Sequence, residues 1–312
     1  MNIVSIKKKE IAVSILLLAI LILPVFSFAG TSKIYVNDNA SGKQDGSLKH
    51  PYKTITQALK KADKDDEVHI ASGTYKENIE IPSRVKVFGS GMDDVVIEAK
   101  DGSQEVVDMH NKSEINKVTV RGGEYGIEVD ENSKASIIKC RVVDNDKDGI
   151  FIEGGDADDK RKISIVESKI EKNGRAGIYS KKSRLVIIEN EIIDNDSDGI
   201  DIAKGSSAWI ADNRIKDNGG SGMKVVLDGS EIWTKNNTFY DNDREGIEIN
   251  AYGQNGRIDI NKSKFYKNDR WGIAKVQKGE FPVSVWNGAV VQGDNIFWEN
   301  KTGDVSDAIS VK

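Results

Sequence analysis

The stretch Asn195-Asp196-Ser197-Asp198-Gly199-Ile200 contains an asparagine, three further residues, a glycine and an aliphatic residue. The same arrangement recurs along the chain, at Asn145-Gly149-Ile150, Asn173-Gly177-Ile178, Asn218-Gly222-Met223, Asn242-Gly246-Ile247 and Asn268-Gly272-Ile273. Successive glycines are 28, 22, 23, 24 and 26 residues apart, which is close to a single period. A period of this length predicts a repeat protein in which each repeat packs on the next.

Each repeat also contains short runs in which apolar residues alternate with other residues. Examples are the pairs Ile163/Ile165, Leu185/Ile187 and Ile258/Ile260. Alternation with a period of two indicates strands that bury one face. We therefore expect two or three short strands in each repeat, separated by turns.

A small polar residue stands five positions before each repeated asparagine, at Cys140, Ser168, Asn190, Asn213, Asn237 and Ser263. An apolar residue follows two positions later, at Val142, Ile170, Ile192, Ile215, Phe239 and Phe265. Because stacked strands lie about 4.8 Å apart, the small polar residues are expected to form an internal ladder of hydrogen bonds. The repeated glycine is expected to adopt a positive φ or to allow close backbone approach.

Repeats of this length, with asparagine ladders and aliphatic interiors, resemble the right-handed parallel β-helix of the pectin-lyase-like superfamily over roughly residues 66–303. The resemblance implies an all-β solenoid. The segments 46–47, 51–58 and 68–79 are also similar to the start of pectin methylesterases, but the paired aspartates and glutamines of that family do not follow. Since the fold carries lyases, hydrolases, esterases, epimerases and adhesins, it implies no single activity.

Residues 54–62 have a helical pattern, with Ile55, Ala58, Leu59 and Ala62 on one face. The spacing of Thr54 and Gln57 is that of a capping box. A short helix is expected to cap the N-terminal end of the solenoid and to shield its strand edge. The predicted organisation is a signal peptide at 1–29, a strand, loop and capping helix at 30–65, the solenoid at 66–303 and a tail at 304–312. This light tail leaves end-to-end self-association open.

The N-terminus has the composition of a secretory signal peptide. Three lysines, Lys7 to Lys9, precede an apolar run from Ile11 to Phe28, and Ser27 and Ala29 form a cleavage site. Cleavage after Ala29 would place the protein outside the cytoplasm, in the periplasm or the extracellular space. An uncleaved membrane anchor is the alternative, because the run reaches the length of about 18 residues that can span a bilayer.

The overall composition excludes some partners. The formal net charge is −5, with acidic and basic residues intermixed and without a basic stripe, which argues against nucleic acid. Cys140 is the only cysteine, so the chain folds without an internal disulfide. The position of Cys140 in the polar ladder indicates a small buried residue.

The residue after each Gly-Ile pair is expected to point outward, which gives the row Glu128, Phe151, Tyr179, Asp201, Lys224, Glu248 and Ala274. Asp201, Lys224 and Glu248 would form a charged ladder, with the two carboxylates about 9–10 Å apart across two coils. That separation is at the upper edge of the range in inverting glycosidases. Lys224 would instead act as a base if its pKa were lowered. The non-catalytic alternative is an ion-pair ladder that stabilises the sheet.

Aromatic residues are also expected on the outer surface. Trp209 and Trp233 would lie on adjacent coils, and Tyr240, Tyr266 and Trp298 would form a second row near basic residues. Exposed aromatic rings beside charges are suited to the apolar faces of sugars and to an acidic glycan. The alternative is that the rings pack against one another and strengthen the sheet.

Acidic loops provide the only metal candidates. Asp156, Asp158 and Asp159 offer oxygen ligands for Ca²⁺, although aspartate beside asparagine and glycine is also typical of turns. His50, His69 and His110 are too scattered in the sequence to predict a zinc site. No other cofactor is expected.

Three functions are consistent with these features. The preferred one is a secreted surface that binds polysaccharide, because outward aromatic and charged residues are expected while the catalytic motifs of known families are missing. The alternatives are a lyase or hydrolase acting on acidic uronate glycans, with Asp201, Lys224 and Glu248 as its catalytic residues, and a structural or adhesive spacer.

Overall fold

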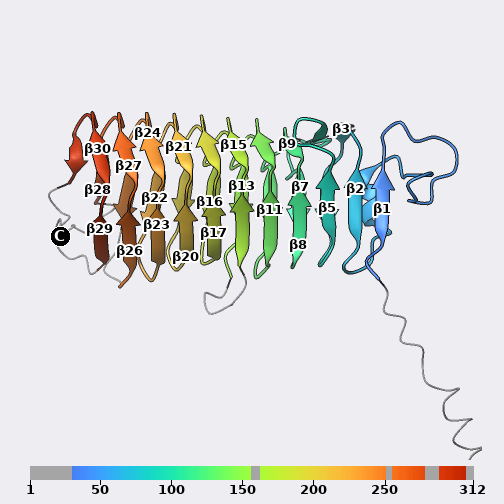
Figure 1. Ribbon diagram of the computed structural model, residues 1–312, viewed down its shortest axis with the longest axis horizontal. Helices are drawn as coiled ribbons and strands as arrows, with labels where there is room; N and C mark the ends of the chain where they lie inside the picture. The colour runs from blue at the N-terminus through green and yellow to red at the C-terminus, as the bar shows by residue number, and fades with distance from the viewer. Residues whose placement is uncertain (1–29, 156–161, 251–254, 278–287, 307–312) are drawn as a thin grey trace, which may run out of the picture. The chain divides into compact units, whose positions relative to one another are not determined.

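The computed structural model describes residues 30–155, 162–250, 255–277 and 288–306 (Figure 1). The chain divides into two units, Met1–Ser32 and Lys33–Lys312, and every described helix and strand belongs to the second. Among the described residues, no helix is both long enough and apolar enough to cross a bilayer. The predicted signal peptide at 1–29 lies outside the described residues.

The unit Lys33–Lys312 is a parallel β-solenoid, as predicted, and its described strands form three sheets. From β2 onward every third strand along the chain joins the same sheet, so each of these coils contributes one strand to each sheet (Figure 1). β1 adds one more strand, beside β2. We name each sheet after its first strand. Described strands number eleven in the β1 sheet and ten each in the β3 and β4 sheets, and all of their pairings are parallel.

The β1 sheet consists, in order, of β1 (Lys33–Val36), β2 (Glu67–Ile70), β5 (Lys86–Gly89), β8 (Ser113–Asn116), β11 (Ala135–Ile138), β14 (Ile163–Val166), β17 (Arg184–Ile188), β20 (Ser207–Ala211), β23 (Glu231–Lys235), β26 (Arg257–Asn261) and β29 (Ala289–Gly293). The β3 sheet consists of β3 (Gly73–Lys76), β6 (Val95–Glu98), β9 (Thr119–Arg121), β12 (Arg141–Val143), β15 (Lys169–Glu171), β18 (Glu191–Ile193), β21 (Arg214–Lys216), β24 (Thr238–Tyr240), β27 (Lys264–Tyr266) and β30 (Ile296–Trp298).

The β4 sheet consists of β4 (Ile79–Ile81), β7 (Val107–Met109), β10 (Ile127–Val129), β13 (Ile150–Ile152), β16 (Ile178–Ser180), β19 (Ile200–Ile202), β22 (Met223–Val226), β25 (Ile247–Asn250), β28 (Trp271–Lys275) and β31 (Gly303–Val305). Its last strand extends the solenoid beyond the predicted boundary at residue 303.

The only described helix is α2 (Ile55–Leu59), which begins where the capping box predicts. Thr54 accepts a hydrogen bond from the Gln57 N–H at 3.2 Å, and the Gln57 side chain accepts one from the Thr54 N–H at 3.2 Å. Ile55, Ala58 and Leu59 are buried, as the helical pattern predicts, and α2 packs against β1, β2 and β4.

The interior is built from rows of aliphatic side chains that repeat from coil to coil. The predicted apolar row from Val142 to Phe265 is in register and fully buried. Phe239, Phe265 and Phe297 continue it as stacked rings, with centroids 5.0 and 5.1 Å apart. Burial of these side chains provides the main driving force for stacking the coils.

The predicted polar ladder is present beside this core. Asn190 donates from Nδ2 to Asn213 Oδ1 at 3.0 Å, and Asn213 donates in the same way to Asn237 Oδ1 at 2.9 Å. The Cys140 N–H donates to Ser168 Oγ at 3.1 Å, and burial raises the pKa of the Cys140 thiol to about 12. Cys140 is therefore the small buried residue that its position predicts.

The repeated asparagines of the Asn-x-x-x-Gly pattern form a second buried ladder, which Asn300 continues. It runs through Asn145, Asn173, Asn195, Asn218, Asn242, Asn268 and Asn300, with Nδ2 to Oδ1 distances of 2.8 to 3.0 Å. The residue before each of these asparagines has a positive φ, for example 59° at Asp194 and 53° at Asp217. This left-handed corner turns the chain into the ladder.

The repeated glycines allow close approach between coils, and their φ values lie outside the left-handed region. A Cβ on Gly199 would lie 2.6 Å from Gly222 O, 2.8 Å from Ile215 Cγ2 and 2.9 Å from Asn218 Nδ2. Gly199→Ala is therefore expected to destabilise the protein by about 1–3 kcal/mol, because backbone and ladder atoms must move. Thermal unfolding measures this cost. Gly30→Ala is the control, because a Cβ there meets no described atom within 4 Å, and an equal loss in both variants would contradict the packing explanation.

Candidate functional site

The outward residues of the β4 sheet form one continuous row. In register they are Glu80, Asp108, Glu128, Phe151, Tyr179, Asp201, Lys224, Glu248 and Ala274. The order predicted from Glu128 to Ala274 is confirmed. Glu80 and Asp108 extend the row toward the N-terminus.

Lys224 lies between two aspartates in this row. Its Nζ forms an ion pair with Asp201 and lies 3.2 Å from Asp198 Oδ2, and its side chain is only 14% exposed. Burial lowers the pKa of Lys224, but the two carboxylates outweigh burial, and the pKa is raised above 10.5. A base at this position would need a lowered pKa, and the pKa of Lys224 is instead raised.

Glu248 is 2% exposed and its oxygens have partners. It accepts hydrogen bonds from Ser221 Oγ at 3.1 Å and Asn250 Nδ2 at 2.9 Å, and it pairs with Arg244 Nη2 at 3.1 Å. Asp201 and Lys224 thus form an ion pair as the stabilising alternative expects, whereas Glu248 pairs with Arg244. A catalytic role for the three residues stays a prediction.

Trp209 and Trp233 are register partners on β20 and β23. They line a groove of about 290 Å³ together with Lys162 and Arg184, and Trp209 is 43% exposed. We call this cavity the Trp groove. The adjacent positions of the two tryptophans are those the sequence predicts, whereas Lys162 and Arg184 were not predicted beside them. The role of this groove in glycan binding stays a prediction.

Tyr240, Tyr266 and Trp298 form a stack along the β3 sheet. Their ring centroids are 4.7 and 4.0 Å apart, with interplanar angles of 11° and 9°. Both faces of the Tyr266 ring are therefore covered by neighbouring rings. Arg214 and Lys216 lie over the Tyr240 ring at 5.3 and 5.6 Å. The stacked rings have the cross-strand packing that the alternative expects, and a role of these residues in glycan binding stays a prediction.

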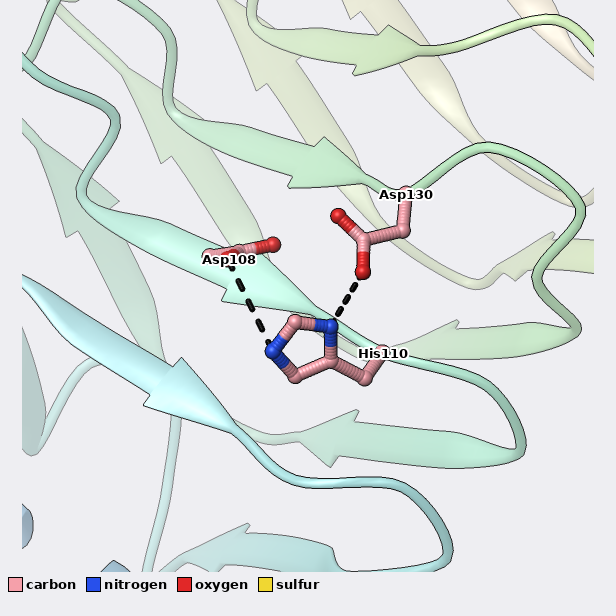
Figure 2. Close-up of side chains that lie close together, drawn as sticks. All are labelled: Asp108, His110 and Asp130. Atoms are coloured by element: carbon pink, nitrogen blue, oxygen red, sulfur yellow. Dashed lines mark hydrogen bonds and ion pairs between the residues drawn. The ribbon is translucent and has the colours of Figure 1, made fainter.

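A cluster that the sequence analysis missed lies on the β4 sheet. Asp108 is on β7, His110 follows the end of that strand, and Asp130 follows the end of β10 one coil later. Figure 2 shows both aspartates directed toward the imidazole. His110 Nδ1 contacts Asp130 Oδ2, while His110 Nε2 lies 3.8 Å from Asp108 Oδ2 and 2.7 Å from Glu80 Oε1. We call Asp108, His110 and Asp130 the His110 cluster.

The next coils of the same row hold a cavity of about 380 Å³, which we call the Phe151 groove. The rings of Phe151 and Tyr179 are stacked with centroids 5.5 Å apart, and Arg175 and Lys181 lie beside them. Asp148 also lines the groove and is 1% exposed. Its Oδ1 accepts from the Ala176 N–H at 2.9 Å, whereas its Oδ2 has no hydrogen-bond partner and lies 3.6 Å from Arg175 Nη1.

Two protein-family models match this chain. The family model described as "Protein of unknown function (DUF1565)" matches residues 37–221, which is more than half of the chain. The chain belongs to the DUF1565 family. The description "Right handed beta helix region" matches residues 156–307. With the observed fold, these matches place the DUF1565 protein among the right-handed parallel β-helices of the pectin-lyase-like superfamily, as the resemblance predicted.

Solved structures show the same fold at low identity. The A-module of the Azotobacter vinelandii mannuronan C-5 epimerase AlgE4 is 13% identical, with a TM-score of 0.54 over 89% of the DUF1565 protein and 100% of that chain. XylC in complex with xylose is 11% identical, with a TM-score of 0.62 over 84% and 70% of the two chains. Pectate lyase Pel9A is 13% identical, with a TM-score of 0.51 over 85% and 80%. No curated protein matches the chain.

Negative charge dominates around the His110 cluster of the DUF1565 protein. Burial and the neighbouring Asp130 raise the pKa of Asp108 to about 6, and burial with Glu105 and Glu153 raises the pKa of Glu128 to about 7. Burial lowers the pKa of His110, but Glu80 and Asp130 raise it by more. Among the described ion pairs, none joins a lysine or arginine to Asp108, Glu128 or Asp130.

A sequence signal for the His110 cluster did exist. Asp108 is on β7 and His110 directly follows its last residue, two positions later, so the alternation of an extended chain puts both side chains on the same face. Pairing of Met109 with Val129 places His110 beside Asp130 in the next coil. The histidines had been compared only with one another. The candidate calcium ligands Asp156, Asp158 and Asp159 lie outside the described residues.

Proposed function

We propose that this DUF1565 protein binds an acidic polysaccharide in the Phe151 groove. The observation that carries the proposal is a groove of about 380 Å³ in which the rings of Phe151 and Tyr179 lie beside the cations Arg175 and Lys181. The lining also contains the carboxyl groups of Glu131, Asp148 and Glu153, so the two cations are the groups proposed to hold an acidic sugar. Its volume lies within the range of about 300–1,000 Å³ typical of ligand sites. A guanidinium presents paired N–H donors that match a carboxylate, which favours a uronate over a neutral sugar.

Asp148 supports a sugar ligand in the same groove. Its Oδ2 is buried, accepts no hydrogen bond and lies 3.6 Å from Arg175 Nη1 in an ion pair. A buried acceptor without a donor costs about 1–3 kcal/mol, and a sugar hydroxyl would supply the missing hydrogen. The solved structures with a similar fold include a mannuronan epimerase, a pectate lyase and a complex with xylose, which supports a saccharide ligand.

The test is retention of the protein in gels containing alginate, pectate or a neutral glucan. The double variant Arg175→Gln with Lys181→Gln is expected to bind at least roughly tenfold more weakly to the polyuronates, because two charged hydrogen bonds of about 1.5 kcal/mol or more are lost. The matched control is Lys49→Gln with Lys53→Gln, which removes the same charge from two exposed lysines. Equal retention of both double variants would refute the groove as the site.

The Trp groove is the second surface for the same function, since it places two tryptophans beside Arg184 and Lys162. Trp209→Ala with Trp233→Ala separates the two surfaces. Retention lost only in this variant would move the binding site to the β1 sheet. No retention on any glycan would leave the structural spacer as the better hypothesis.

An enzyme acting on acidic glycans is a second candidate function. The observation that favours it is an imidazole between two carboxylates, on the same row of the β4 sheet as the Phe151 groove. New unsaturated or reducing ends from alginate or pectate, lost in His110→Asn, would support catalysis. Retention without new ends would leave a binding protein.

The proposed function includes a location outside the cytoplasm. Cleavage after Ala29 would release the protein to the periplasm or the extracellular space, and N-terminal sequencing of the mature protein tests it.

The helix α2 packs on β1, β2 and β4 in the first coils. We propose that it caps the N-terminal end of the solenoid.

A further inference from the structure

We propose that Asp108, His110 and Asp130 bind one divalent transition-metal ion of the Zn²⁺ or Mn²⁺ class. Each residue offers one ligand atom, and the three atoms lie within 4.8 Å of one another. Ligand atoms that share one Zn²⁺ at about 2.0–2.2 Å lie roughly 3.5 Å apart in tetrahedral geometry. Small side-chain rotations would close the remaining distance, because all three residues are at the surface of the sheet (Figure 2).

The ligand types select the class of metal. One imidazole with two carboxylates suits Zn²⁺, Mn²⁺ or Fe²⁺. Ca²⁺ prefers six to eight oxygen ligands, and Mg²⁺ prefers an octahedron of oxygens. The nitrogen of His110 therefore makes this site chemically different from the all-oxygen calcium candidates Asp156, Asp158 and Asp159.

Two features of the cluster favour a bound metal over a histidine that is only hydrogen-bonded. Asp108 Oδ1 is buried and has no hydrogen-bond partner, so a carboxylate oxygen at the cluster lacks a cation or donor. A metal on His110 Nδ1 would leave the Nε2–H to donate to Glu80 Oε1, which lies 2.7 Å away. A carboxylate on the second ring nitrogen is the usual support of a metal-bound histidine.

The charge around the cluster also calls for a cation. Glu80, Asp108 and Glu128 occupy the same register position in three consecutive coils. Asp130 lies two residues after Glu128 in the third of these coils. The imidazole of His110 can carry only one positive charge among these four carboxyl groups, which repel one another when they are ionised. Among described ion pairs, His110 supplies the only positive partner of Glu80, Asp108 and Asp130. A divalent ion would offset two further charges.

Titration calorimetry of the metal-free full chain with Zn²⁺, Mn²⁺ and Ca²⁺, each alone and without glycan, tests the proposal. We expect one Zn²⁺ or Mn²⁺ per chain. We expect His110→Asn to weaken binding more than about 100-fold and Glu80→Gln to weaken it about 10–100-fold. The Co²⁺-loaded protein should show a visible absorption band that is absent in His110→Asn. Because no glycan is present, the result is independent of the proposed polysaccharide binding.

The control is His69→Asn. His69 lies 3.0 Å from Glu67 on the β1 sheet and stacks on Tyr35 and Phe88, so it is also an imidazole beside a carboxylate. Equal Zn²⁺ binding by wild type and His110→Asn, equal weakening by His69→Asn, or binding of Ca²⁺ alone would each overturn the proposal. If His110→Asn fails to fold, Asp130→Asn replaces it, because Asp130 is the most exposed of the three ligands.

Discussion

Replacing Lys224 by methionine is expected to lower the free energy of unfolding by about 3–5 kcal/mol at neutral pH. The Lys224 ammonium pairs with both Asp198 and Asp201, whose side chains are largely buried. Methionine keeps most of the side-chain length but removes the charge, so two carboxylates remain close together without their cation. Urea denaturation of the wild type and the variant measures the difference.

The pH dependence separates charge from packing in this variant. In the wild type the pKa of Lys224 is raised, so its contribution to stability is complete below pH 10.5 and is lost as the pH rises through the raised pKa. In Lys224→Met the destabilisation should instead shrink on acidification, because protonation removes the unpaired negative charge. Asp201→Asn in the Lys224→Met background should recover part of the loss. A variant as stable as the wild type would contradict the buried ion pair.

Asn218→Ala should destabilise the protein by a similar amount, about 3–5 kcal/mol, because at least two buried polar groups lose a partner at about 1–3 kcal/mol each. Asn218 Oδ1 accepts from the Asn195 N–H at 3.2 Å and from Asn195 Nδ2 at 3.0 Å. Its Nδ2 donates to Asn242 Oδ1 at 3.0 Å and to Ile192 O at 3.2 Å. Thermal unfolding checks the prediction.

Asn39→Ala is the matched control for the ladder variant. Asn39 is exposed, and its side chain donates to Asp38 Oδ1 at 2.8 Å. Its loss should change stability by less than about 0.5 kcal/mol. If Asn218→Ala were equally mild, water would have to replace the ladder bonds, and the ladder would not hold the coils together.

The regular coils could be predicted from the sequence in some detail. Between Gly149 and Gly272 the glycine spacing aligns the coils, and that alignment gave the register of Asp201 with Lys224 and of Trp209 with Trp233. The same alignment gave the buried ladder from Asn190 to Asn237. The repeated motif is sufficient for this because each coil contacts mainly its two neighbours.

The candidate site was harder to predict, for two physical reasons. The coils around Asp108 and Asp130 lack the Asn-x-x-x-Gly pattern that aligned the later coils, so the pairing of Met109 with Val129 was not available. The direction of the Lys224 pKa shift depends on Asp198, which reaches the ammonium from the turn before β19. Strand alignment alone does not show that contact.

The in-register pairing of the β4 sheet has a consequence for any long ligand. Each coil advances the outer row by one strand spacing, about 4.8 Å, whichever residue occupies the row. The fold thus works as a ruler, because the interval between binding groups is set by the backbone while their chemistry is set coil by coil. Along this ruler, the carboxylates from Glu80 to Glu128 give way to the rings of Phe151 and Tyr179 and then to Asp201 and Lys224. A single substitution on the row therefore changes the chemistry at one coil and leaves the spacing between coils unchanged.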